Sequence, residues 1–265
     1  MVEVHSVTTR KGIDAKVHTR GSGPPVVFFH GAGGVFPIEP MLDLVAERFT
    51  VHGAEWPGFG DEATEGSLED MLDFSLHGWD LVDALRLDQR PHVMGHSMGG
   101  MIAAEMAALN PGGIDRLVLI GSAGLWIDAH PVPDIFAMLP MEMAEVLFAD
   151  PAMGVAVLAG GLDFNDDKAL EAFLVTNSRR LGTAAKILFP IPNRRLSKRL
   201  YRVTNPTLLL WGAQERLFPA VYAQRFKELL VNAPAEITLI EQAGHMLPYE
   251  QPAAAAAAIT EFLSR

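Results

Sequence analysis

Short apolar segments alternate with helical patterns along most of this chain, and this alternation restricts the fold more than any other sequence feature. A strand that is followed by a helix and then by another strand builds a parallel sheet. Before the alternation begins, residues 2–9 and 13–19 are typical of a hairpin. The sequence therefore predicts an α/β fold with a mostly parallel, eight-stranded sheet flanked by helices. The expected strands are residues 2–9, 13–19, 25–29, 50–54, 92–95, 117–120, 207–211 and 237–240.

Amphipathic or alanine-rich patterns between these strands predict helices, and the last of them closes the chain. Ser67 directly precedes the second helix and Asp70 follows three residues later, which is the spacing of a capping box. The expected helices are residues 40–47, 68–87, 98–109, 220–231 and 253–264.

One interval interrupts the alternation, because residues 122–205 separate the strand at 117–120 from the strand at 207–211. About 80 residues are too many for a loop. Met, Leu and Phe are frequent in this interval, and helices are expected near residues 133–148 and 169–181. We therefore predict a helical insertion over one edge of the sheet, with a core domain formed by residues 1–121 and 206–265.

Composition and charge exclude several classes of function. The 265 residues include no cysteine, which excludes disulfides, cysteine-ligated zinc, iron–sulfur clusters and a thiol nucleophile. A formal charge of −11 argues against binding to nucleic acid or anionic lipid, and the basic residues 194–202 are expected to form a solvated helix face. A signal peptide and a membrane-spanning apolar run are not apparent, so we expect a cytoplasmic protein without membrane or nucleic-acid partners.

The sequence Gly95-His96-Ser97-Met98-Gly99 connects an expected strand to an expected helix. Its G-x-S-x-G spacing is that of a nucleophile elbow, in which the serine occupies a strained turn. Residues two before and two after the serine must lack side chains that would collide with the strand or the helix. The turn directs the serine oxygen to the carboxyl end of the sheet, where the helix presents its first N–H groups.

A serine nucleophile needs a base, and a carboxylate that orients this base. Nine histidines are available. His245 is the preferred base because Gly244-His245 follows the last strand and precedes the final helix. His96 flanks the serine on a turn that directs it away from the serine oxygen, and His30 begins a glycine loop. His52, His77 and His92 are expected to be structural residues of strands or helices.

Over essentially its whole length the chain resembles the α/β-hydrolase superfamily. The resemblance rests on several motifs in order, and it places the interval 122–205 where that superfamily has a cap domain that covers the active site. These motifs are His30-Gly31 after the third strand, Trp56-Pro57-Gly58-Phe59-Gly60 after the fourth, the elbow at Gly95 to Gly99, Trp211-Gly212 with an acid nearby, and Gly244-His245.

The resemblance implies a catalytic triad of Ser97, Glu215 and His245. The family usually has Asp where this chain has Glu215, and Asp128, after the sixth strand, is the alternative acid. Glu215 is preferred because Trp-Gly precedes it and Pro219 follows it in the family register. The resemblance also implies an oxyanion hole formed by the N–H groups of Met98 and Ala32, with Gly33 as the alternative to Ala32.

Serine at the elbow indicates acyl transfer to water, because the haloalkane dehalogenases and epoxide hydrolases of this superfamily use Asp there. We expect a carboxylic ester hydrolase that acts on small to medium, largely apolar esters as a monomer or homodimer. No cofactor and no metal are expected, because the histidines and carboxylates are scattered and the loop at Gly31 lacks the Gly-Lys-Ser/Thr ending of a phosphate loop. The expected apolar lining, or else the cap's own small core, is formed by Phe136, Met138, Leu139, Met141, Met143 and Phe148.

Three alternatives use the same residues. The first is a carbon–carbon bond hydrolase of ring-cleavage dienones, although relatives of that type usually have Asn and Trp where this chain has His96 and Met246. Cap arginines such as Arg179, Arg180 or Arg194 could then bind a substrate carboxylate. The second is hydrolysis of a lactone or thioester. The third is a ligand receptor on the same fold without catalysis.

Overall fold

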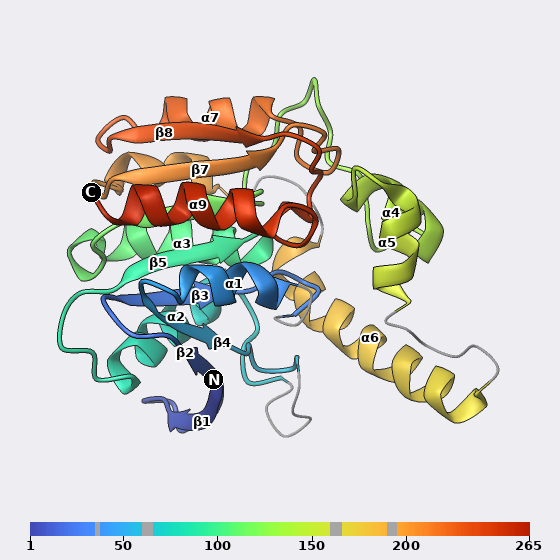
Figure 1. The fold of residues 1–265 in the computed structure, drawn as a ribbon, viewed down its shortest axis with the longest axis horizontal. Coiled ribbons are helices and arrows are strands. Elements are labelled where there is room, and N and C mark those ends of the chain that lie inside the picture. The colour runs from blue at the N-terminus through green and yellow to red at the C-terminus, as the bar shows by residue number, and fades with distance from the viewer. Residues whose placement is uncertain (35–37, 60–65, 160–165, 190–194) are drawn as a thin grey trace.

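The computed structural model describes residues 1–265 except 35–37, 60–65, 160–165 and 190–194. Its centre is an eight-stranded sheet with the order β1-β2-β4-β3-β5-β6-β7-β8 (Figure 1). β1 pairs antiparallel with β2, and β2 pairs antiparallel with β4, whereas every later pair is parallel. The expected mostly parallel sheet is confirmed. The strands are β1 Glu3–Thr8, β2 Asp14–Arg20, β3 Pro25–Phe29, β4 Thr50–Ala54, β5 His92–His96, β6 Leu117–Ile120, β7 Thr207–Gly212 and β8 Ala235–Ile240.

Helices cover both faces of the sheet because strand side chains alternate between the faces. Val26 and Phe28 of β3 pack in the core that includes α1 and α9, whereas Val27 and Phe29 pack in the core that includes α2, α3 and α7. Figure 1 shows α9 and α1 together in front of the strands. The helices outside residues 122–205 are α1 Glu39–Val45, α2 Met71–Ala84, α3 Met98–Leu109, η3 Pro111–Gly113, α7 Val221–Leu229, α8 Leu247–Glu250 and α9 Pro252–Leu263.

The start of α2 differs from the expected capping box. Asp70 is itself the N-cap residue, and its side chain accepts hydrogen bonds from the N–H groups of Leu72 and Asp73. An N-cap aspartate satisfies two N–H groups of the first turn, so the helix begins at Met71 and not near Leu68. The predicted role of Ser67 is therefore wrong.

The segment between β6 and β7, residues 122–205, is called the inserted segment below. It contains α4 Pro140–Leu147, α5 Pro151–Leu158, α6 Asp167–Leu188, η4 Leu196–Lys198 and η5 Leu200–Arg202. Figure 1 shows α4, α5 and α6 at one end of the sheet. The helix expected near residues 133–148 begins only at Pro140, because proline suits the first helical position and disfavours a helical conformation in the residue before it.

The last part of the inserted segment is anchored on α3. The guanidinium of Arg199 forms a two-point ion pair with the buried carboxylate of Glu105, with 2.7 Å between Nε and Oε2. Arg202 donates to the carbonyl of Ala108, and Asn205 donates to the carbonyl of Ile114. The basic stretch forms two short 3-10 helices against α3: Arg195, Lys198 and Arg202 are exposed, as expected for a solvated face, whereas Arg199 is half-buried in its ion pair. Arg194, its first residue, lies outside the described residues.

We predict that Arg199→Ala lowers the free energy of unfolding by about 3 kcal/mol, because it leaves the buried Glu105 carboxylate without its cation. Urea unfolding monitored by tryptophan fluorescence measures this change. Arg225→Ala is the control, since Arg225 and Glu228 form an exposed pair worth less than about 0.5 kcal/mol. Equal effects of the two substitutions would contradict the prediction.

Candidate active site

Ser97 lies between β5 and α3 in a backbone conformation that side chains rarely adopt. Its φ is 55° and its ψ is −116°. Hydrogen bonds fix this turn on both sides, because Ser97 N–H donates to Ile120 O and the Ser97 carbonyl accepts from Met101 N–H. A strained conformation persists only where the surrounding structure holds it, and such residues cluster at functional sites. The geometry is that of the sharp turn expected from the sequence.

The two glycines of the motif allow three backbone segments to approach closely. A Cβ atom on Gly95 would overlap the backbone of Gly99, and a Cβ atom on Gly99 would overlap the carbonyl of Phe29 in β3. Neither position can accept a side chain without moving the backbone. A side chain at either position would therefore collide with the backbone, as expected from the sequence.

His245 and Glu215 are in contact at the carboxyl ends of β8 and β7. The Nδ1 atom of His245 lies 2.9 Å from Oε2 of Glu215, and both side chains are buried. The other carboxylate oxygen, Oε1, accepts from the N–H groups of Leu217 at 2.8 Å and Phe218 at 3.1 Å. This carboxylate is held at both oxygens, so it can orient the imidazole and leave Nε2 to act on a proton.

Asp128, the alternative acid, lies elsewhere. Its carboxylate accepts from the indole N–H of Trp126 at 2.8 Å and is exposed. The structure brings Glu215, and not Asp128, to His245.

His96 contacts His245 in a way that the sequence did not predict. Its Nε2 donates to the backbone carbonyl of His245 at 2.9 Å, and the two ring centroids are 4.9 Å apart. Burial, together with the neighbouring His245, lowers the pKa of His96 to about 3, so its ring is neutral at physiological pH. These partners are 149 residues apart, so no local pattern could have identified the contact.

In the part of the chain that the structure describes, no hydrogen bond joins Ser97 and His245, which is common before substrate binds.

The loop after β3 lies directly beside the serine. A Cβ atom on Gly31 would lie 3.0 Å from Cβ of Ser97. Ala32 in this loop is half-buried, and Met98 is the first residue of α3. Among the described residues, the N–H groups of Ala32 and Met98 have no hydrogen-bond acceptor. Both donors remain free to bind an oxyanion, whereas Gly33, the alternative to Ala32, is exposed.

His30 fixes the start of this loop. Its Nδ1 donates to Gly31 O at 2.7 Å, and its Nε2 accepts from Trp56 N–H at 3.1 Å. Burial lowers the pKa of His30 to about 4, which keeps the ring neutral and able to accept at Nε2. His30 therefore has a structural role here. Gly60, the last residue of the motif after β4, lies outside the described residues.

His77 in α2 is a buried histidine of a different kind. Its ring lies 5.9 Å from the Trp56 ring, and neither ring nitrogen has a hydrogen-bond partner among the described residues. Burial, with a smaller contribution from Lys11, lowers its pKa to about 4. The structural role expected for His77 is consistent with this apolar site.

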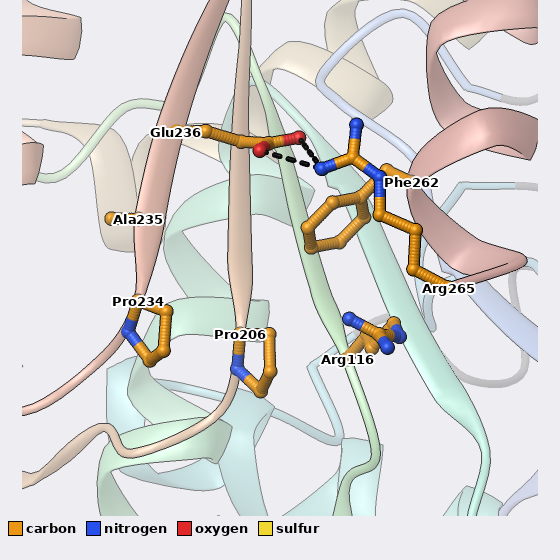
Figure 2. Close-up of a pocket in the computed structure, with 7 residues that line it drawn as sticks. All are labelled: Arg116, Pro206, Pro234, Ala235, Glu236, Phe262 and Arg265. Carbon is orange, nitrogen blue, oxygen red and sulfur yellow. Dashed lines mark hydrogen bonds and ion pairs between the residues drawn. The ribbon is translucent and has the colours of Figure 1, made fainter.

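A separate pocket of about 360 Å³ lies at the end of the strands opposite to the candidate site (Figure 2). Arg116, Pro206 and Pro234 in its wall each directly precede one of the strands β6, β7 and β8. The pocket is therefore at the amino ends of these strands, whereas Glu215 and His245 follow carboxyl ends.

Within the described ranges, no group of three histidine or acidic side chains could hold a metal ion, and no helix is long and apolar enough to cross a membrane.

Comparisons with known proteins agree with this architecture. A family model described as alpha/beta hydrolase fold matches residues 24–252. The chain is 30% identical over 240 residues to the dihydrolipoyllysine-residue acetyltransferase component of the acetoin cleaving system of Pseudomonas putida. That match covers 86% of the chain, and the chain spans 60% of that relative's length.

A full-length relative and a solved structure are also similar to the chain. The 2-hydroxy-6-oxo-6-(2'-aminophenyl)hexa-2,4-dienoic acid hydrolase of Metapseudomonas resinovorans is 24% identical over 266 residues, covering 96% of the chain and 89% of that protein. Naproxen esterase from Bacillus subtilis superimposes with a TM-score of 0.75 at 19% identity, covering 99% of the chain and 92% of that structure. The expected fold class is confirmed.

We predict that the free energy of unfolding falls as the pH drops from 6.5 toward 4. In this range the histidines of the unfolded chain become protonated, whereas the buried His30 and His77 of the folded chain stay neutral. The pKa of His77 is about 4 in the folded chain and 6.5 in its ordinary range, so His77 alone accounts for about 2 kcal/mol of the stability lost at pH 5. The His77→Phe variant should not show this part of the loss. Urea unfolding at pH 7.5 and pH 5 gives the two free energies. An unchanged difference between them in the variant would contradict the prediction.

Proposed function

Since the chain belongs to the alpha/beta hydrolase family, we propose that it is a serine hydrolase that cleaves carboxylic esters through an acyl-enzyme at Ser97. The observation that supports this most directly is the strained turn of Ser97 beside a histidine loop whose His245 is held by Glu215. A binding protein has no need of such a turn, and strain at a nucleophile is part of a catalytic design.

In the proposed mechanism, Ser97 Oγ attacks the ester carbonyl and His245 Nε2 takes the serine proton. The negative charge on the carbonyl oxygen is stabilised by the N–H groups of Met98 and Ala32. His245 then gives the proton to the leaving alcohol, which leaves the acyl group on Ser97. In the second half, His245 takes a proton from water as the water attacks the acyl group, and it returns a proton to Ser97 Oγ as the acid is released. Glu215 accepts from Nδ1 of His245 and stabilises the imidazolium that forms at each step.

The glutamate in place of the usual aspartate is compatible with this role. Its longer side chain reaches His245 from the loop after β7, and two backbone N–H groups fix its free oxygen. Hydrogen bonds from N–H groups to a carboxylate oxygen restrict the rotation of the carboxylate. The extra methylene therefore adds no freedom at the atom that contacts the imidazole.

We further propose that residues 122–205 form a cap over a core domain of residues 1–121 and 206–265, and that this cap selects small to medium, largely apolar acyl groups. Of the expected lining residues, Phe148 is fully buried. Leu139 and Met141 are 67% and 71% exposed, so they do not contribute to an apolar wall. Phe136, Met138 and Met143 are half-buried and remain the candidates.

We predict that a series of p-nitrophenyl esters from acetate to palmitate has its highest rate at short or medium chain length. Ser97→Ala should reduce kcat by about 10⁵-fold or more on each ester, since no other group replaces the nucleophile. Ser264→Ala, at the exposed end of the chain, is the matched control. Activity that persists in Ser97→Ala would exclude the proposed mechanism.

A second test separates catalysis from ligand reception on the same fold. A fluorophosphonate labels a serine efficiently only when a neighbouring base activates it, so the native protein should bind the probe covalently at Ser97. A protein that is not labelled would favour the receptor. Lactones and thioesters can be compared with the esters in the same assay, because the same residues would act on them.

The second candidate function is carbon–carbon bond hydrolysis of a dienoic acid, which is the named activity of the relative from Metapseudomonas resinovorans. One observation in this chain favours it. Arg180 of α6 donates from Nε to the carbonyl of Phe59 at 3.2 Å, beside the loop that begins at His30. A guanidinium at this place could bind the carboxylate of such a substrate. His96 and Met246 depart from the usual residues of those enzymes.

If the chain cleaves a dienoic acid, we predict that Arg180→Gln raises KM for that substrate roughly tenfold to a hundredfold, because a charge-assisted hydrogen bond is lost. KM for a neutral p-nitrophenyl ester should stay the same. Steady-state kinetics on both substrates measures the difference, with the exposed Arg10→Gln as control. An equal rise of KM on both substrates would exclude a carboxylate contact.

A further inference from the structure

Glu250 links the candidate catalytic histidine to the inserted segment. It is the last residue of α8, five residues after His245 in the chain. One carboxylate oxygen, Oε2, accepts from the N–H of Gly244 at 2.7 Å. The other, Oε1, accepts from the N–H of Ala149 at 2.7 Å, between α4 and α5. A single side chain thus joins the peptide before His245 to the turn at residues 147–150, which is called the α4–α5 turn below.

The residues next to the candidate triad make further hydrogen bonds to the same part of the chain. Met246, which follows His245, donates its N–H to the carbonyl of Leu147 at 3.0 Å. Arg216, which follows Glu215, donates from Nη1 to the carbonyl of Glu145 at 2.7 Å and to that of Phe148 at 3.2 Å. Both loops that present candidate catalytic side chains are therefore attached to the end of α4.

The backbones of the histidine loop and the α4–α5 turn approach each other closely at this junction. A Cβ atom on Gly244 would lie 2.8 Å from the amide nitrogen of Ala149 and 3.0 Å from the carbonyl carbon of Phe148. Phe148 itself is fully buried, with its ring 6.3 Å from that of Tyr249. Backbone N–H groups that are enclosed between two such segments need a hydrogen-bond acceptor close by. The Glu250 carboxylate accepts from the N–H groups of both Gly244 and Ala149.

We propose that Glu250 is a positioning residue for His245, and that the α4–α5 turn is a fixed wall of the histidine loop. The proposal rests on the proposed function of Ser97 and His245. A carboxylate offers an acceptor to each of two N–H groups, and such charge-assisted bonds are stronger than neutral ones. A displacement of about 1 Å at a catalytic group can lower a rate by about 10²-fold, so a junction that fixes Gly244 has direct consequences for catalysis.

Glu250→Gln tests this assignment with little change in shape. Glutamine has one acceptor oxygen and one NH₂ group, so either Gly244 N–H or Ala149 N–H would face another donor. We expect kcat on p-nitrophenyl butyrate, and the rate at which a fluorophosphonate labels Ser97, to fall together by roughly tenfold to a hundredfold. KM should stay within about twofold, because Glu250 acts on His245 and not on the substrate.

Glu241→Gln is the matched control, since Glu241 is exposed in the loop that follows β8. A Glu250→Gln protein with a lower melting temperature but unchanged kcat would show a purely structural role and overturn the proposal. A change in KM with constant kcat would also overturn it. If Glu250→Gln does not fold, Glu250→Asp replaces it, because the shorter carboxylate can reach only one of the two N–H groups and should lower kcat and the labelling rate in the same way.

The labelling experiment also distinguishes this inference from the proposed function. A wild-type protein that neither reacts with the fluorophosphonate nor hydrolyses esters would overturn both. A wild-type protein that is labelled, beside a folded Glu250→Gln variant labelled at the same rate, would overturn the role of Glu250 alone.

Discussion

The close approach of α3 to β3 and β5 is the constraint on which the rest of the structure depends. It is sterically allowed because Gly95 and Gly99 have no side chains, and it holds Ser97 at positive φ. Every residue of α3 from Met98 to Ala108 is buried, which a helix rich in alanine and glycine permits at close packing distances. The same helix carries Glu105, which forms the ion pair with Arg199, so the serine precedes a helix that is both buried and anchored.

Around this centre, the candidate site groups come from different loops, and hydrogen bonds from neighbouring and from distant residues fix these loops. Two backbone N–H groups hold Glu215, the ring of His96 holds the carbonyl of His245, and His30 holds the carbonyl of Gly31. Burial keeps both rings uncharged, and this leaves Nε2 of His30 able to accept from the N–H of Trp56. Loops carry function well when a scaffold holds them in this manner.

The sequence predicted the strands well, because β3, β4 and β6 are short apolar runs bounded by turn residues. It also predicted the elbow and the contact of Glu215 with His245, whose motifs lie in order along the chain. It did not predict what depends on distant pairing: the cap at Asp70 was placed three residues early, and the basic stretch packs on α3 because Glu105 is buried there. The contacts of His96 and Glu250 with other loops follow from the tertiary fold and have no local signal.

The anchoring of residues 199–205 on α3 has a consequence for how this architecture can diversify. Arg199, Arg202 and Asn205 bind the scaffold through Glu105 and backbone carbonyls that belong to the core. The chain between the α4–α5 turn and Leu196 can then be exchanged for a segment of other length or composition, while the return to β7 stays in register and the contacts of that turn with the histidine loop are kept. A chimera with a foreign helical segment would have its natural junction just before η4, and recombination at that point would leave the serine turn undisturbed.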